Sequence, residues 1–137
     1  MSAASDYLEN VVLDHVLNSP GSAYTAPTTL YLGLFTNDST NAATNLEAGT
    51  LTDELSGNSY VRKSVTFGSA SSGSCTTDAT VTFDAATGNW GTITHLAVLD
   101  AETSGNVLFW GALTASKTIE SGDTMQFVSN NITISLA

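Results

Sequence analysis

The 137-residue chain has very few positive charges. Its only cationic side chains are Arg62, Lys63 and Lys117, against 13 acidic residues, for a formal net charge of −10. Nucleic-acid binding draws its affinity from Lys and Arg residues that displace counterions from phosphates. Three cations on an acidic chain cannot supply that affinity. The composition therefore argues strongly against a nucleic acid as partner, and it disfavours an anionic membrane surface for the same reason.

Cysteine and long apolar runs are also scarce. Cys75 is the only cysteine, so no intramolecular disulfide can form and the chain must fold without one. No apolar run approaches the ~18–20 residues that span a bilayer, and the first residues lack the basic and apolar regions of a signal peptide. We therefore expect a protein that is used without secretion and has no membrane partner.

Residues that carry chemistry are equally few. His15 and His95 lie far apart in the sequence, and neither has a nucleophile motif or zinc-ligand spacing around it. The adjacent carboxylates at 53–54 are a poor match to the spaced pair of a glycosidase. We predict no enzymatic activity, no cofactor and no metal site. The acidic loops 37–41 and 100–106 stay open as weak alternatives for calcium.

A helical pattern covers Ser5–Asn18. Asp6 followed by Glu9 predicts a capping box at its start, and the Asn-Ser-Pro-Gly sequence from Asn18 predicts its end. One face carries side chains at helical spacing that we treat as a candidate interface: Tyr7, Leu8, Val11, Val12, His15 and Val16. We expect this face to pack against the chain's own sheets, with a partner protein as the alternative.

From Thr29 onward the apolar residues alternate with a period of two, which is typical of β-strands. Polar turn sequences rich in Gly, Ser and Asp separate the runs. Seven strands are predicted: Thr29–Phe35, Tyr60–Phe67, Thr77–Phe83, Thr92–Leu99, Val107–Leu113, Met125–Val128 and Ile132–Leu136. Short strands with turns every ~8–12 residues indicate an all-β sandwich or jelly roll. In the fourth strand we place His95 on the same packing face as Ile93, Ala97 and Leu99.

The long polar segment Thr36–Ser59 interrupts this pattern. Loops of such length in compact domains are usually functional or flexible. Its residues Leu46, Leu51 and Leu55 suggest that the segment is partly held against the core. If Leu46 or Leu51 were exposed, they would join Val16 as interface candidates.

Aromatic residues give the main functional alternative, which is carbohydrate binding by stacking. Trp110 lies within a run that is apolar on both faces, so we expect it to be buried. Trp90 is flanked by Asn89 and Gly91, and it is the candidate exposed aromatic.

Together these patterns predict a mainly β protein, with an N-terminal amphipathic helix packed on a β-sandwich or jelly-roll-like domain of about seven or eight strands. We expect residues 1–137 to form a single domain, in which 1–19 are an N-terminal arm and helix and 28–137 are a β-sandwich with a long loop at 36–59.

Six segments in this order resemble a family of small virion proteins of tailed bacteriophages, usually labelled phage tail fibre protein. They are SDYLEN…LDHVL at Ser5–Leu17, TLYLGLFT at Thr29–Thr36, YVRKSVTFG at Tyr60–Gly68, VTF at Val81–Phe83, NWGTITHLAVLDA at Asn89–Ala101 and LFWGALTASKTIESGD at Leu108–Asp123. The segments 37–59 and 69–78 have no counterpart in this resemblance.

The resemblance implies a non-enzymatic structural protein of the virion, assembled in the host cytoplasm in many copies. A fibre normally has an elongated trimeric shaft, and no such repeat is present, so we expect a capsid decoration or cement protein on the shell surface. The alternative is a tail fibre or other tail-associated protein that contacts the host, with a host glycan as its target. The expected partners are further copies of the chain, as a trimer by analogy, and the major capsid protein or tail proteins.

Overall fold

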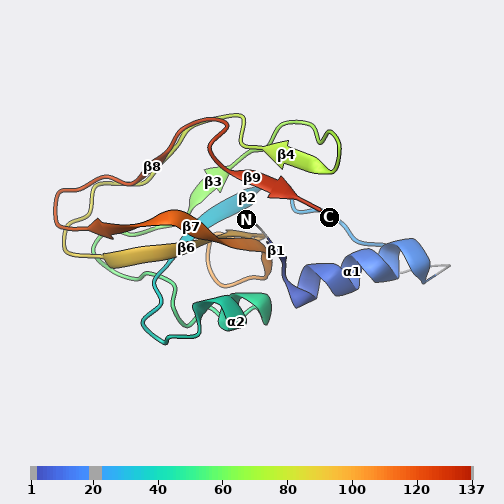
Figure 1. The fold of residues 1–137 in the computed structure, drawn as a ribbon, viewed down its shortest axis with the longest axis horizontal. Helices are drawn as coiled ribbons and strands as arrows, with labels where there is room; N and C mark the ends of the chain where they lie inside the picture. Colours follow the sequence, from blue (N-terminus) through green and yellow to red (C-terminus); the bar gives the residue numbers. More distant parts are fainter. Residues whose placement is uncertain (1–2, 19–22, 137) are drawn as a thin grey trace.

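The computed structural model describes residues 3–18 and 23–136, and its fold is mainly β. The chain forms a central antiparallel sheet with small strand pairs on one face and a short helix on the other, while a second helix extends from one end (Figure 1). This agrees with the predicted class, an N-terminal helix on a sandwich-like β structure.

The central sheet has five strands in the order β1–β7–β6–β2–β3, and all neighbours are antiparallel. Their bounds are Ala3–Ala4 for β1, Leu30–Phe35 for β2, Lys63–Val65 for β3, Gly91–Leu99 for β6 and Val107–Ile119 for β7. The strand β2 is buried over most of its length because it lies between two neighbours and is covered on both faces. This explains why its sequence is apolar on both sides.

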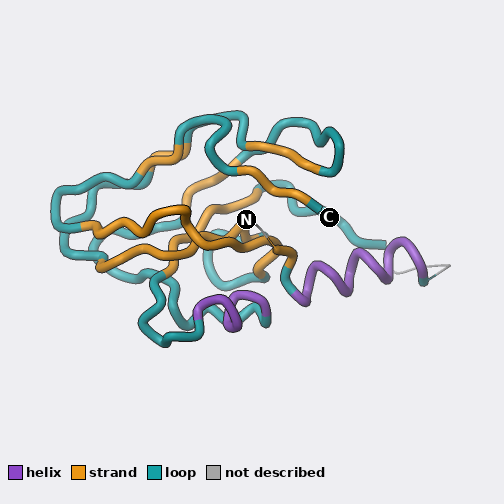
Figure 2. Tube along the Cα trace, in the orientation of Figure 1, coloured by secondary structure: helices purple, strands orange, loops and turns teal. Residues whose placement is uncertain are grey.

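Two short strand pairs cover one face of this sheet. The pair β4 (Ser74–Thr76) and β9 (Thr133–Ser135) lies beside the pair β5 (Val81–Thr82) and β8 (Gln126–Phe127), as the tube in Figure 2 shows. The main core fills the space between the layers and includes Leu32, Leu34, Phe83, Ile93 and Val98. The predicted strands 60–67 and 77–83 are therefore shorter in the structure, and β4 was not predicted.

A second, smaller core lies on the opposite face of the sheet. There the helix α2 (Ala42–Glu47) places its buried Leu46 against Phe35, Ala97 and Leu99 of the central strands. The segment 36–59 thus contains a helix that the sequence pattern did not reveal. Leu46 is buried and Leu51 is half-buried, so neither becomes an exposed interface candidate.

A wide bulge interrupts the pairing of β6 with β7. The pairs Ile93–Lys117 and His95–Ala112 leave β7 residues 113–116 opposite residue 94 alone. Because of this bulge, Ile93 belongs to the main core, whereas Ala97 and Leu99 belong to the α2 side. The prediction that His95 shares a face with Ile93 is therefore wrong, since period-two alternation fails across a bulge.

The N-terminal helix α1 spans Asp6–Leu17. Its N-cap is Ser5, one residue before the predicted capping box, and the Ser5 Oγ accepts a hydrogen bond from the Leu8 amide at 3.3 Å. The predicted stop at 18–21 lies partly outside the described residues. No helix in the described segments has the length and apolar character needed to cross a membrane.

Candidate interaction surfaces

Helix α1 is attached to the sheets through its first turn alone. The Ser5 amide donates to the Leu108 carbonyl at 2.9 Å, and the Ser5 Oγ donates to the Val107 carbonyl. Leu8 is the one buried residue of the helix. Beyond this turn α1 runs away from the sheets, as Figure 1 shows. The expectation that its apolar face packs along the sandwich therefore holds for the first turn and fails for the rest.

The second half of α1 presents apolar side chains to solvent. Val12, Leu13, Val16 and Leu17 have exposed fractions of 42%, 54%, 67% and 72%. At 100° per residue these four positions form a stripe about 140° wide. An isolated helix of this length is only marginally stable in water, so an uncovered apolar stripe on it indicates a missing contact.

The predicted interface residues divide between these two parts of the helix. Leu8 is buried within the chain and Val11 is half-buried, whereas Tyr7, Val12 and Val16 are exposed. His15 is exposed as well, and its Nδ1 accepts a hydrogen bond from the Tyr24 amide at 3.2 Å. That bond ties the helix to the returning chain. The prediction missed Leu13 and Leu17, which extend the stripe away from the face that Leu8 defines.

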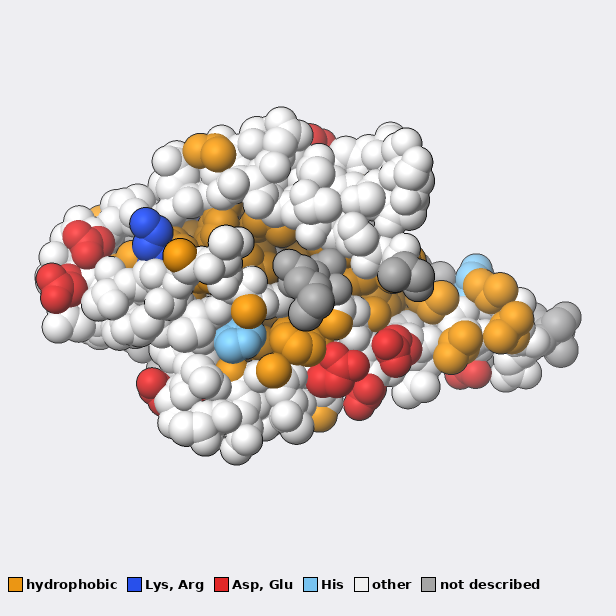
Figure 3. All heavy atoms as spheres, viewed as in Figure 1, with side chains coloured by type: hydrophobic (Ala, Val, Ile, Leu, Met, Phe, Trp, Pro, Cys, Tyr) orange, Lys and Arg blue, Asp and Glu red, His pale blue; other side chains and the backbone are white. Residues whose placement is uncertain are grey.

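A groove of about 650 Å³ lies between β7 and the segment that carries β8 and β9. Its lining combines the apolar residues Phe109, Leu113, Met125, Phe127 and Ile134 with polar ones such as Thr114 and Gln126. Figure 3 shows apolar side chains gathered in this hollow and along α1 on the same face of the molecule. The groove is open because, among the described strands, only the two-residue β1 pairs with the outer edge of β7, at Phe109 and Trp110.

Neither tryptophan offers an exposed platform for a sugar. Trp90 is 6% exposed, so the prediction of an exposed aromatic is wrong. Its ring packs edge-on against Tyr60 at 5.7 Å between centroids, and its indole N–H donates to the Asn58 carbonyl at 2.9 Å. Trp110 is half-buried, and its indole N–H donates to a Glu47 carboxylate oxygen at 2.6 Å.

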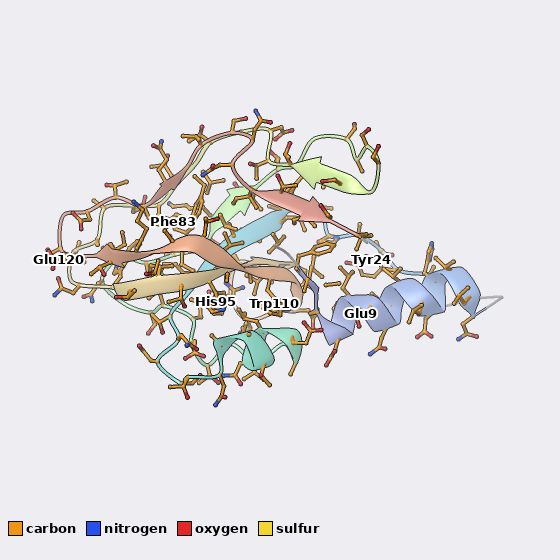
Figure 4. The ribbon with its side chains drawn as sticks, in the orientation of Figure 1. Glu9, Tyr24, Phe83, His95, Trp110 and Glu120 are labelled. Carbon is orange, nitrogen blue, oxygen red and sulfur yellow. The ribbon has the colours of Figure 1, made fainter. Side chains whose placement is uncertain are left out.

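Carboxylates from α1 and α2 gather below Trp110. One oxygen from each of Asp6, Glu9 and Glu47 lies within 4.8 Å of the others (the labelled Glu9 and Trp110 lie near this region in Figure 4). Asp6 and Glu9 belong to the first turn of α1, where carboxylates are favoured by the helix dipole. The cluster is thus accounted for by helix capping and by the indole contact of Glu47.

His95 lies on the α2 face beside Trp110, with ring centroids 6.3 Å apart. Burial lowers the pKa of His95, and the nearby Asp53 carboxylate partly offsets this effect. Its Nδ1 shares a 2.8 Å hydrogen bond with the Thr94 hydroxyl. The ring is therefore a half-buried packing element of the smaller core.

Asp53 organises the loop that was considered for calcium. Its carboxylate accepts hydrogen bonds from the Ser39 amide at 2.9 Å, the Ser39 hydroxyl at 2.6 Å and the Asn45 side-chain amide at 3.3 Å. Burial by itself would raise the pKa of Asp53, but these donors lower it below its ordinary value. The hydrogen bonds use both carboxylate oxygens to close the loop onto α2.

Arg62 holds a second buried polar centre at the other end of this segment. Its guanidinium makes a bidentate ion pair with Glu54, with N–O distances of 2.6 and 2.7 Å, and donates to the carbonyls of Ala101 and Ser104, both at 2.7 Å. Tyr60 donates to Glu54 at 3.0 Å, and burial followed by the Glu54 charge raises the pKa of its hydroxyl. This network joins three segments of the chain.

The second calcium alternative is a closed hairpin. The Asp100 carboxylate accepts hydrogen bonds from the Asn106 amide at 2.7 Å and from its side-chain amide at 2.8 Å. The Arg62 guanidinium also donates hydrogen bonds to the Ala101 and Ser104 carbonyls of this loop. Asp100 therefore has a structural role in its own loop, as Asp53 has in closing the loop at 37–41.

Comparison with known families adds the decisive observation. Residues 3–135 match the family described as "Podophage GP4 fiber I protein gp80". The chain belongs to this phage fibre protein family. No curated protein matches it closely enough to count as a relative.

Membership supports the predicted class, a structural protein of a tailed phage particle. The description of the family agrees with the fibre alternative better than with capsid decoration. For a fibre protein, surfaces that contact other proteins are the functional sites. The exposed half of α1 and the groove beside β7 are candidates for such surfaces among the described residues.

Proposed function

We propose that this protein is a structural component of the fibre of a podophage particle, attached to its neighbours through the exposed half of α1. The family match supports the fibre, and the uncovered stripe of Val12, Leu13, Val16 and Leu17 supports the attachment. Burying such side chains contributes about 1.5–3 kcal/mol each. Copies repeated along a particle would add such contacts by multivalency.

The end of the molecule opposite α1 is then directed outward. It consists of polar loops around Asn58, Asn89 and Glu120, and Figure 4 places the labelled Glu120 far from Glu9 of α1. The loop around Asn58 is tightly held, because the Asn58 carbonyl accepts from the Trp90 indole and its side-chain amide donates to the Asn89 carbonyl at 3.2 Å. A rigid loop surface rich in amides and hydroxyls is the part of this protein suited to contact a host glycan.

The test of attachment uses phage that carry the double variant Leu13→Gln/Leu17→Gln. Both side chains are exposed and glutamine keeps a high helix propensity, so the fold is preserved while the apolar stripe is removed. We expect loss of the protein from purified virions, measured by quantitative mass spectrometry. The matched control is Asn10→Gln/Asp14→Gln on the polar side of α1, which should be incorporated normally.

Full incorporation of Leu13→Gln/Leu17→Gln, or of a chain lacking residues 1–19, would contradict the attachment role. The same measurement on unmodified virions gives the copy number relative to the major capsid protein. A few to a few dozen copies agree with a fibre. Near parity would instead assign the protein to the shell as a decoration.

A further inference from the structure

Two of the open surfaces of the described residues carry apolar side chains, and they cannot meet within one molecule. The first is the stripe on the second half of α1, and the second is the groove beside β7. The Ser5 hydrogen bonds to the Val107 and Leu108 carbonyls fix the root of α1 at the start of β7. From there the helix runs away from the sheets, while the groove extends along β7 toward Ile119 (Figure 1).

We propose that the second half of α1 inserts into the groove beside β7 of a second copy of this chain. This inference rests on the proposed attachment role of α1 and names its partner. The sizes agree: the segment from Val12 to Leu17 is a cylinder about 9 Å long and about 10 Å across, or about 700 Å³. The groove measures about 650 Å³ and is open along one side.

The width of the stripe also favours a groove over a single facing helix. A two-helix contact buries a narrow seam, whereas a stripe about 140° wide needs cover from more than one side. The groove provides such cover, because β7 forms one wall and the segment from Asp123 to Ile134 forms the other. Its apolar floor includes Phe109, Leu113 and Met125.

The charges of α1 and of the groove also favour this contact. Arg62 pairs with Glu54 and Lys63 pairs with Asp84, but no acidic side chain of the described residues lies within ion-pair distance of Lys117. Lys117 lies in the wall of the groove. Helix α1 carries Asp6, Glu9 and Asp14 and no Lys or Arg. Pairing α1 with α1 of another copy would bring these like charges together, whereas the lining of the groove balances the acidic Asp123 with Lys117.

A contact of this kind is heterologous, because each copy uses its helix on one neighbour and its groove on another. Heterologous contacts close into rings when the rotation permits and otherwise continue as filaments. The bulge at 113–116 has a defined role in this arrangement. It leaves residues 113–116 of β7 without regular partners on β6, and such an irregularity blunts a strand edge against sheet extension.

The test mixes two variants of the purified full chain, each defective in one half of the contact. Leu13→Gln/Leu17→Gln removes the stripe, and Ala115→Arg places a long charged side chain at an exposed position of the groove wall. We expect the native protein to self-associate in sedimentation velocity, and each variant alone to be weakened more than about a hundredfold. A one-to-one mixture should form a dimer, because an intact helix and an intact groove remain, one on each partner.

Matched controls are Asn10→Gln on α1, which leaves every charge of the helix in place, and Ser64→Arg on β3, which is exposed and outside the groove. Both should associate like the native chain, and circular dichroism should show that every variant is folded. Lys117→Glu should weaken association about two- to fivefold, as for an exposed ion pair.

Disulfide cross-linking between two copies tests the helix-to-groove contact independently of sedimentation. In a Cys75→Ser background, Val16→Cys on one copy and Ala115→Cys on another should form a mixed disulfide. Formation of Val16→Cys homodimers alone, or assembly that survives Ala115→Arg, would show that helices pair with helices and would overturn the proposal. A native chain that stays monomeric would overturn it too. If the helix variant still fails to enter virions, α1 attaches to another particle protein and the proposed function stands.

Discussion

The segment 36–59 and helix α1 are held in opposite ways. The segment is polar and mostly irregular, yet it is fixed by the buried Leu46, by three donors on the Asp53 carboxylate and by the Glu54–Arg62 pair. Helix α1 is regular and rich in apolar residues, yet it is held by Ser5 and Leu8 in its first turn and by one hydrogen bond from Tyr24 to His15. The difference shows that regular structure and firm attachment have separate causes. Attachment depends on buried contacts, and those of α1 lie mostly outside its own chain in our proposal.

The largest expected loss of stability is at Arg62, whose buried ion pair with Glu54 holds the segment 36–59. Arg62→Met leaves the Glu54 carboxylate and two carbonyls without their donor, and removing one member of a buried ion pair costs about 3–5 kcal/mol. Urea unfolding followed by tryptophan fluorescence measures this loss. Lys63→Met, in the neighbouring exposed pair with Asp84, is the control and should cost less than about 1 kcal/mol. Equal costs for the two variants would mean that the buried network does not hold the segment.

A second prediction compares one leucine from each region. Leu46→Ala should lower the free energy of unfolding by about 2–5 kcal/mol, because the side chain is 1% exposed and its removal leaves a cavity. Leu17→Ala removes the same group from an exposed position on α1. It should change the stability of the monomer by no more than about 0.5 kcal/mol. Denaturation at low protein concentration separates this effect from self-association, and a large cost at Leu17 would place α1 against its own sheets.

The third prediction concerns the attachment point of α1. Ser5→Ala removes the N-cap acceptor and a buried donor to the Val107 carbonyl, which should cost about 1–2 kcal/mol. Because these bonds fix the helix to β7, hydrogen exchange in α1 should quicken more than exchange in β2 or β6. Ser5→Thr keeps the hydroxyl and tests whether it, rather than the size of the side chain, is responsible. Unchanged exchange in α1 would remove Ser5 from this role.

The smallest expected effect is a pH dependence that comes from Asp53. Hydrogen bonds from Ser39 and Asn45 outweigh burial and lower its pKa in the folded state below the unfolded value of about 3.9. Its stabilising contribution is therefore present above about pH 4 and is lost as the pH falls through the lower, folded pKa. Asp53→Asn should make the free energy of unfolding fall less steeply as the pH drops below about 4. Asp14→Asn, which removes an exposed carboxylate from α1, is the matched control and should leave this pH dependence unchanged.

Sequence reasoning found the elements whose signals are local. The helix at Ser5–Asn18 and the strands at 30–35 and 91–99 follow from apolar periodicity, and each lies where it was expected to within a residue or so. The family resemblance rested on ordered segments of the same kind, and the family match over residues 3–135 confirms it. The acidic composition argues against nucleic acid and an anionic membrane as partners, and this stays a prediction.

The errors at Trp90 and His95 share one cause, which is that distant segments decide which side chains are buried and on which face they lie. Trp90 looked exposed between Asn89 and Gly91, but Tyr60 and the Asn58 carbonyl cover it from a part of the chain more distant in sequence. The face of His95 changed because β7 inserts a bulge opposite residue 94, and nothing in the β6 sequence signals that. Helix α2 was missed because its six residues are too short and polar for a periodic signal.

The sequence by itself therefore determined the class of the fold, the positions of the elements with a strong periodic pattern and the polar, acidic character of the chain. These depend on nearby residues and on composition, which the chain carries in any conformation. Only the tertiary structure decided that Leu8 is covered while Leu13 and Leu17 are not, and that a groove opens beside β7. The physical reason is that burial of an apolar side chain is favourable wherever it lies in the sequence. The contacts made by the rest of the chain decide whether that side chain is buried within the molecule.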